Sequence, residues 1–409
     1  MKVAERLGDK DNNFNLIRFI AASLVVFSHA GLLIGYISSF EPVLYGVPFF
    51  TIGAIGVNVF FVVSGFLVTK SLFERKDVIS FGVARALRIF PAFWVMLIVS
   101  VFAIGGAMTA LPLADYFSSP EVFSYVWNWA TLASEQKLFL PGVFDHNIDK
   151  IFNRALWTLP LEWRLYEFLA LFWILSFFLR SHRRLVASIL APCAAAYCLY
   201  ETYDFATRGF VIFLEYMNFY MFLAGATIYL FGSRIAVSLK YVLAATIICA
   251  SCSFNVTALA VAYTLALPLV VITLAYLRFH PILKFNRIGD YSYGIYIYGY
   301  PVQQMLAALF PKAPYGLVLI SNFSIVFLFA FLSWRLVEKP MLARKETVSL
   351  AIKRLFGGFV FQAPRKARAP VYDQISVEVP AASGARGVNR PERVLTLAKA
   401  GVNHLALTE

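Results

Sequence analysis

Apolar segments of about 20 residues follow one another along this chain from Phe14 to Met341. They are interrupted by charged residues, glycine or proline, and about 20 apolar residues are what an α-helix needs to cross the hydrocarbon core of a bilayer. The pattern therefore predicts an all-α integral membrane protein, a bundle of about ten transmembrane helices within residues 1–341. The expected spans are 14–36, 45–70, 87–108, 156–179, 185–201, 210–232, 236–252, 255–277, 288–310 and 315–337.

Basic residues fall in alternate connections between these segments. Lys and Arg gather at 2–10, 70–85, 180–184, 234–240 and 278–287, whereas the connections near 37–44 and 253–254 have none. Because short loops rich in Lys and Arg stay on the cytoplasmic side of a membrane, we expect both termini inside.

The composition agrees with a membrane protein. Of the 409 residues, 60% are hydrophobic and 14% are charged, whereas soluble domains have about 25% charged residues. The net charge of +13 comes largely from basic residues at helix ends, where membrane topology accounts for them, so we expect no nucleic-acid partner. The pair Cys249 and Cys252 lacks the second cysteine pair and the histidines of a zinc site, so we predict no metal.

Two segments depart from the pattern of short connections. The segment 109–155, on the outer side, carries Trp127, Trp129 and several carboxylates, and it is expected to form either a cap on the bundle or a lid over an acceptor. The segment 342–409 is rich in Pro, Lys and Arg. We expect it to be a cytoplasmic, largely disordered tail with an amphipathic helix near 346–361.

The first apolar segment contains two ionisable residues, Arg18 and His29. Eleven residues separate them. In an α-helix this spacing places the two side chains within about 20° of the same face and about 16 Å apart along the axis. Buried ionisable groups are costly in a membrane, so a fixed cation and a titratable base on one face indicate a catalytic pair. The alternatives are a snorkelling arginine and a histidine that bonds to a neighbouring helix.

Two further clusters are candidates for binding. Arg85 and Arg88 are three residues apart and are expected just before the third helix. They face the same way and suit a phosphate group, although they also suit a lipid head-group anchor. Glu162 and Tyr166 share a face at the outer entry to the fourth span. There Glu162 either caps the helix, orients a histidine or binds a sugar hydroxyl.

Taken in order, six motifs of the chain resemble the bacterial membrane-bound acyltransferase family three, over about residues 12–341. That family includes O-acetyltransferases of surface polysaccharides and of nodulation factors. The motifs are Ile17-Arg18-Phe19 running to His29, Phe60-Phe61-Val62-Val63-Ser64-Gly65, Arg85-Ala86-Leu87-Arg88, Leu156-Trp157-Thr158-Leu159 with Glu162 and Tyr166, Ile288-Gly289-Asp290-Tyr291-Ser292-Tyr293, and Trp334-Arg335-Leu336-Val337-Glu338.

This resemblance implies ten helices with both termini inside, in a multi-pass protein of the bacterial inner (cell) membrane. It implies acyl-coenzyme A, usually acetyl-coenzyme A, as the donor, and a hydroxyl of an extracytoplasmic glycan or lipid-linked saccharide as the acceptor. The site residues expected are His29, Arg18, Glu162 and Glu338 for catalysis, Arg85 and Arg88 for the coenzyme, and Tyr166, Ser292, Tyr293 and Trp157 for the substrate. His29 is the expected general base.

One position departs from the family pattern. Many relatives have a histidine where this chain has Gly299, so we expect His29 to act without a second histidine. The alternative to an acyltransferase is a proton-coupled transporter of a glycan or small acid, because a bundle with intramembrane Arg and His also suits transport. An inverted repeat is not visible in the sequence, and consumption of a thioester distinguishes the two functions.

Overall fold

The computed structural model of the chain describes residues 2–9, 11–33, 51–132, 136–208, 213–278, 285 and 289–355. The chain divides into two units, Met1–Ala363 and Pro364–Glu409. The second unit, and with it most of the tail expected at 342–409, lies outside the described residues. The first unit contains the whole candidate site.

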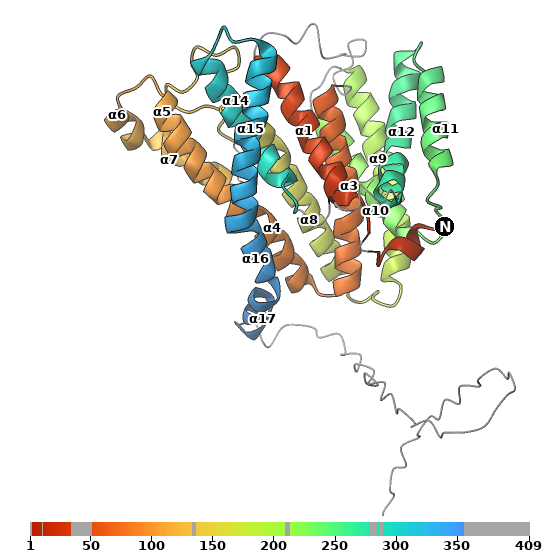
Figure 1. Cartoon of the computed structure of the whole chain (residues 1–409). Coiled ribbons are helices and arrows are strands. Elements are labelled where there is room, and N and C mark those ends of the chain that lie inside the picture. Colours follow the sequence, from red (N-terminus) through yellow and green to blue (C-terminus); the bar gives the residue numbers. More distant parts are fainter. Residues whose placement is uncertain are drawn as a thin grey trace, which may run out of the picture. The chain divides into compact units, whose positions relative to one another are not determined.

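The described part of the first unit is helical and has no strand (Figure 1). Each of the ten expected spans contains a helix, so the prediction of a multi-pass helical membrane protein is confirmed. The helices in these spans are α1 (Phe14–Leu33), α3 (Ile52–Arg75), α4 (Val78–Ile98), α8 (Thr158–Leu175), α9 (Arg183–Thr207), α10 (Phe213–Leu230), α11 (Leu239–Ser251), α12 (Val256–Tyr276), α14 (Ser292–Leu309) and α15 (Tyr315–Ser333).

Six helical segments in the described residues are long and apolar enough to cross a membrane by length and composition: Phe14–Gly31, Ile52–Arg75, Val78–Met108, Arg183–Asp204, Thr257–Tyr276 and Tyr315–Ala343. Of the other four, α11 is shorter, with 13 residues. The helices α8, α10 and α14 are not among these six, and they carry carboxylate, tyrosine or amide side chains. Many of those polar side chains belong to the site described below.

The third span begins earlier than expected. Helix α4 starts at Val78, where the Asp77 side chain accepts a hydrogen bond from the Ile79 backbone N at 3.1 Å. Arg85 and Arg88 therefore lie about two turns inside the helix and not before it. Their charges break the apolar pattern, but both side chains face a cavity in the bundle and not lipid.

Two π-helical segments extend these spans. η4 (Val99–Gly105) and the short α5 (Gly106–Met108) continue α4, and η7 (Trp334–Glu338) with α16 (Lys339–Ala343) continues α15. A π turn inserts one residue and rotates the remainder of the helix, and such turns are frequent at functional sites. In η7 it brings Glu338 into the bundle, where the side chain is 1% exposed.

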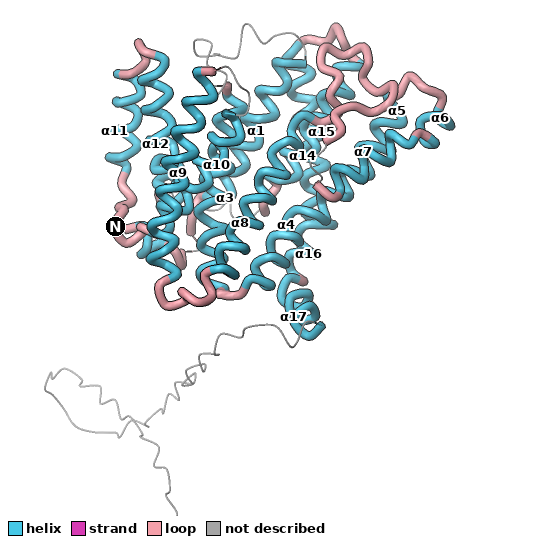
Figure 2. Tube along the Cα trace, turned by 180° about the vertical axis from the view of Figure 1, so that it is seen from behind, coloured by secondary structure: helices cyan, strands magenta, loops and turns pink. Residues whose placement is uncertain are grey.

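The described part of the segment 109–155 packs against the bundle. It contains α6 (Leu113–Ser118) and α7 (Pro120–Ala130) and leads into η5 (Arg154–Trp157). Tyr116 and Trp129 are buried, and the Trp94 indole of α4 donates to the Ala130 carbonyl oxygen at 3.0 Å. Figures 1 and 2 both place α6 and α7 at the edge of the bundle opposite α11 and α12.

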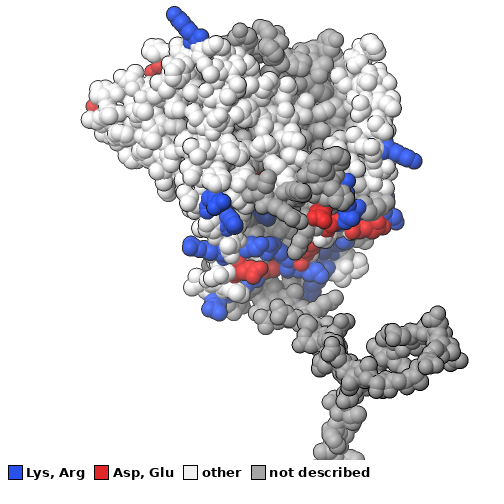
Figure 3. All heavy atoms as spheres, in the orientation of Figure 1, with Lys and Arg blue, Asp and Glu red and all other residues white. Residues whose placement is uncertain are grey.

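Charged side chains gather at one end of the bundle. In Figure 3, Lys, Arg, Asp and Glu concentrate low on the visible face, near α17 (Lys345–Leu355), while the face above is nearly bare. There Lys353 of α17 pairs with Asp77, and its Nζ donates to Ser80 Oγ at 2.9 Å. This polarity agrees with the positive-inside orientation expected from the loops.

Helices α3 and α10 cross at two glycines. A Cβ at Gly65 would lie 1.9 Å from the Phe222 carbonyl oxygen, and one at Gly225 would lie 2.2 Å from the Val62 carbonyl oxygen. Small residues let membrane helices approach until their backbones touch. The contact fixes α3, which lines both cavities of the site.

We predict that Gly65→Ala separates α3 from α10 and lowers the free energy of unfolding by about 3 kcal/mol, the upper end of overpacking effects. Thermal unfolding of the purified protein in detergent measures it. Gly82→Ala in α4 is the control, because nothing lies within 4 Å of a Cβ there. Equal stability of the two variants would contradict the close crossing.

Candidate active site

An inner cavity of about 100 Å³ lies between α1, α3, α4, α8 and α14. Its polar lining comprises Arg18, Ser64, Arg85, Arg88, Thr158, Glu162, Tyr166, Tyr293 and Tyr296. Five helices thus bring together side chains from most of the motifs expected to form the site. The remaining lining is apolar, from residues such as Val57, Phe61 and Leu159.

Two of the arginines share a buried carboxylate. Asp290 accepts from Arg18 and, at 2.5 Å, from Arg88, whose other terminal nitrogen lies 3.2 Å from Glu338. Ser292 donates to Asp290 at 2.5 Å, and Ser333 donates to Glu338 at 3.1 Å. Two cations and two anions are therefore paired inside the bundle.

Arg85 is held differently. In the described part of the chain no carboxylate lies within ion-pair distance of it, and its buried Nε has no hydrogen-bond partner there. The guanidinium carbon lies 5.9 Å from the centre of the Tyr166 ring, which provides a cation–π contact. Glu162 lines the same cavity and attracts Arg85 from beyond ion-pair distance. A buried cation that faces a cavity and has no carboxylate within ion-pair distance among the described residues is suited to an anionic ligand group such as a phosphate.

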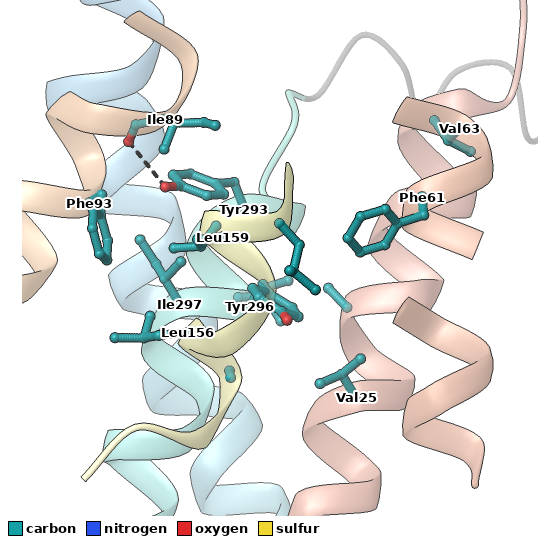
Figure 4. Close-up of a cluster of buried hydrophobic side chains, with 14 of the residues drawn as sticks. Val25, Phe61, Val63, Ile89, Phe93, Leu156, Leu159, Tyr293, Tyr296 and Ile297 are labelled. Carbon is teal, nitrogen blue, oxygen red and sulfur yellow. Dashed lines mark hydrogen bonds between the residues drawn. The ribbon is translucent and has the colours of Figure 1, made fainter. Parts of the chain in front are cut away.

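On the α8 side of this cavity, Glu162 accepts hydrogen bonds from Tyr166 and, at 3.1 Å, from Ser64. The pair Glu162 and Tyr166 has the i, i+4 arrangement expected from the sequence. Tyr293 completes the wall, because its hydroxyl donates to the Ile89 carbonyl oxygen at 3.0 Å (Figure 4). These bonds fix the polar groups before any ligand binds.

An outer cavity of about 190 Å³ contains His29. It lies between α1, α3, η5, α10 and α14, and its polar lining includes Ser28, Thr51, Asn58, Trp157 and Asn218. Among the described residues, the ring nitrogens of His29 have no hydrogen-bond partner. The imidazole faces a molecule that enters this cavity.

The outer segment supports His29 through Tyr300 of α14. The two rings meet edge to face with centres 5.0 Å apart, and the Tyr300 hydroxyl donates to Asp149. Asp149 also pairs with Arg154 at 2.6 Å. Burial raises the pKa of the Asp149 carboxyl, but hydrogen bonds from Tyr300, the Ile151 backbone and Arg154 outweigh burial and hold that pKa below its ordinary value.

The structure separates the residues that the sequence placed together. Arg18 lines the inner cavity and His29 the outer one, although both lie on α1. Trp157 lines the outer cavity, whereas Ser292 lines neither and instead binds Asp290. Gly299 packs against α1, where a Cβ would lie 2.6 Å from Val26 Cγ2.

Three residues near the site were not predicted as functional: Asp290, Thr158 and Tyr296. A carboxylate at the start of an apolar span is the signal that points to Asp290, since intramembrane arginines need a counter-ion. Thr158 and Tyr296 are linked by a hydrogen bond of 2.6 Å between their hydroxyl groups, across 138 residues of sequence. Spacing along one helix cannot indicate such a contact.

A family model described as an acyltransferase domain matches residues 11–335 of the chain. The chain belongs to the acyltransferase 3 family. The protein is therefore a membrane acyltransferase, as the motifs predicted, and this membership does not support the transporter alternative.

Two relatives align with this chain over nearly the whole of their own length. An O-acetyl transferase of Shigella phage Sf6 is 30% identical over 347 residues, which are 82% of this chain and 97% of the phage protein. Nodulation protein 10 of Rhizobium leguminosarum bv. viciae is 29% identical over 367 residues, 84% of this chain and 96% of that protein. No solved structure matches the chain of this acyltransferase.

We predict that Asp290→Asn destabilises this acyltransferase by about 3 kcal/mol, because removing one partner of a buried ion pair leaves charge uncompensated. Glu74→Gln is the control: Glu74 lies 3.9 Å from Lys70 on the surface, and its loss costs less than about 1 kcal/mol. Chemical or thermal unfolding compares the two. If Asp290→Asn is as stable as Glu74→Gln, Asp290 is not the required counter-ion.

The lowered pKa of Asp149 predicts a pH dependence. Its carboxylate stabilises the fold above about pH 4, its ordinary range, and this contribution is lost as the pH falls through the lower folded-state value. Asp149→Asn should therefore melt below wild type at neutral pH, and the difference should shrink below pH about 4. Asp145→Asn in the same segment is exposed and serves as the control. A pH-independent difference for Asp149→Asn would contradict this.

Proposed function

We propose that this acyltransferase moves an acyl group, most simply acetyl, from cytoplasmic acyl-coenzyme A to a hydroxyl of an extracytoplasmic glycan. The observation that carries the proposal is the pair of adjacent cavities. One is rich in arginine and the other contains His29, and Val57 and Tyr296 line both. Donor and acceptor then enter from opposite sides and meet at the junction.

The donor side rests on Arg85. Coenzyme A carries phosphate groups, and Arg85 is a cation of the inner cavity without a carboxylate partner among the described residues. We assign Arg85 to phosphate binding. Arg88 has two carboxylate partners, so its role is to position the network with Arg18, Asp290 and Glu338.

The thioester-bearing arm of the donor contains amide groups, which need hydrogen-bond partners in an apolar bundle. Glu162, Tyr166 and Ser64 form a bonded group on the cavity wall. We assign these side chains to the arm of the donor. Tyr293 and Arg18, which line the same cavity from α14 and α1, are assigned to the region nearer the thioester.

The acceptor side rests on His29. As general base, a neutral imidazole takes the proton of the acceptor hydroxyl while the hydroxyl oxygen attacks the thioester carbonyl carbon. A carbon–oxygen bond forms, the carbon–sulfur bond breaks, and the proton ends on the coenzyme thiol. Trp157 in the same cavity offers an aromatic face for a sugar ring.

The acetyl group is supported by the phage relative, and the saccharide acceptor by the resemblance of the motifs to O-acetyltransferases of polysaccharides and nodulation factors. The name of the phage protein states O-acetyl transfer, and the second relative is a nodulation protein. The charge distribution supports donor entry from the cytoplasmic side, in a multi-pass protein of the bacterial inner membrane.

The test is release of free coenzyme A from acetyl-coenzyme A by the purified protein in lipid, with and without glycan acceptors. Loss of a general base lowers the rate by about 10²–10⁴-fold, so His29→Ala should lower kcat at least about 100-fold. Arg85→Ala should raise the KM for the donor by about tenfold or more, since it removes a charge-assisted contact.

His182→Ala and Arg354→Ala are matched controls, because both residues are exposed and lie far along the chain from the cavity residues. They should leave kcat and KM unchanged. Normal transfer by folded His29→Ala rejects the base assignment. Absence of thioester consumption by the wild-type protein with every acyl donor and acceptor tried rejects the proposed function itself.

A further inference from the structure

We infer that Tyr296 is a specificity-determining residue that separates the donor and acceptor cavities and makes the enzyme transfer its acyl group to the acceptor hydroxyl in preference to water. The inference rests on the proposed function and adds a role that the sequence motifs do not assign. It begins from the two residues, Tyr296 of α14 and Val57 of α3, that line both cavities.

The ring of Tyr296 bridges three helices at this junction. Its centre lies 5.7 Å from that of Phe60 on α3, edge to face, and its hydroxyl is 2.6 Å from Thr158 Oγ1 at the start of α8. The side chain is only 7% exposed. Figure 4 shows it between Leu159 on one side and Val25 and Phe61 on the other.

A contact between η5 and α14 also fixes the backbone next to Tyr296. Its neighbour Ile297 is buried, and the Ile297 carbonyl accepts from Asn153 Nδ2 at 2.9 Å. The Asn153 side chain in turn caps η5, the segment that ends beside Thr158. The Thr158 hydroxyl and the Tyr296 ring are therefore positioned by the same contact, the hydrogen bond from Asn153, the N-cap of η5, to Ile297 of α14.

A barrier at this place has a chemical reason. His29 activates any hydroxyl in the outer cavity, and water there would attack a thioester as readily as the acceptor does, giving free acid and the coenzyme thiol. Excluding water until the acceptor is present prevents this loss. The ring of Tyr296 closes the inner cavity, and Val57, which also lines both cavities, adds no polar group to which water binds.

The first test uses the ratio of acceptor-independent to acceptor-dependent release of coenzyme A. Tyr296→Ala joins the cavities and should raise this ratio by about tenfold. Tyr296→Phe and Thr158→Val keep the volume but remove the bond between the hydroxyls, and each should raise the ratio severalfold.

Tyr298→Ala is the matched control, because Tyr298 lies on the same helix, stacks on Phe329 at 5.1 Å and lines neither cavity. A merely structural role of Tyr296 would lower both activities together and leave the ratio unchanged. That result in Tyr296→Ala, or in Tyr296→Phe and Thr158→Val if the alanine variant does not fold, overturns the inference.

The second test does not depend on activity. Ala54 lines only the outer cavity, so in a chain without its native cysteines Ala54→Cys reports access from each side of oriented vesicles to a membrane-impermeant thiol reagent. With Tyr296 present, only reagent on the outer side should label it. With Tyr296→Ala added, labelling should occur from both sides.

Labelling from both sides with Tyr296 intact, or from one side only after Tyr296→Ala, refutes the barrier. This outcome is separate from failure of the proposed function, which is absence of thioester consumption by the wild-type protein. The two conclusions can therefore fail independently.

Discussion

The ion pairs around Asp290 hold the inner half of this bundle together. A charged side chain in the hydrocarbon region costs several kcal/mol unless it is paired, and here Arg18, Arg88 and Glu338 come from three segments that are far apart in the chain. Asp290 lies between the two arginines, just before α14 begins. Pairing these groups fixes α1, α4, η7 and the start of α14 relative to one another, so one electrostatic requirement positions three of the five helices that line the inner cavity.

That requirement also explains why Arg85 differs from Arg88. The described carboxylates of the network balance Arg18 and Arg88, and Arg85, one turn earlier on α4, has none within ion-pair distance. Buried ion pairs such as those of Arg18 and Arg88 have a structural explanation, because each charge satisfies its partner. Arg85 has the cation–π contact with Tyr166 and only the more distant Glu162 carboxylate, which makes it the strongest indication of an anionic ligand among the described residues.

The helical bundle was largely predictable from the sequence, because the length of an apolar segment reports directly on membrane crossing. The start of α4 was not predictable. Two arginines usually mark the end of a membrane span, and the sequence alone does not show that Arg85 and Arg88 face a cavity inside the bundle. The single face of α1 that carries Arg18 and His29 was predicted from helical geometry. Their division between two cavities was not, because the dividing ring comes from Tyr296 on α14, and helix spacing contains no information about neighbouring helices.

A direct transfer across a membrane imposes two conflicting demands on one bundle. Donor and acceptor must meet, so the cavities must connect during the reaction, yet an open path would let water reach the thioester. A rigid apolar wall would satisfy the second demand and defeat the first. An aromatic side chain suits both demands, because packing on Phe60 and a hydrogen bond to Thr158 worth about 1 kcal/mol hold Tyr296 closed against water, while rotation of one side chain opens the path. The absence of a second histidine fits this arrangement, since Gly299 lets α14 lie against Val26 of α1, and the next residue, Tyr300, contacts the His29 ring.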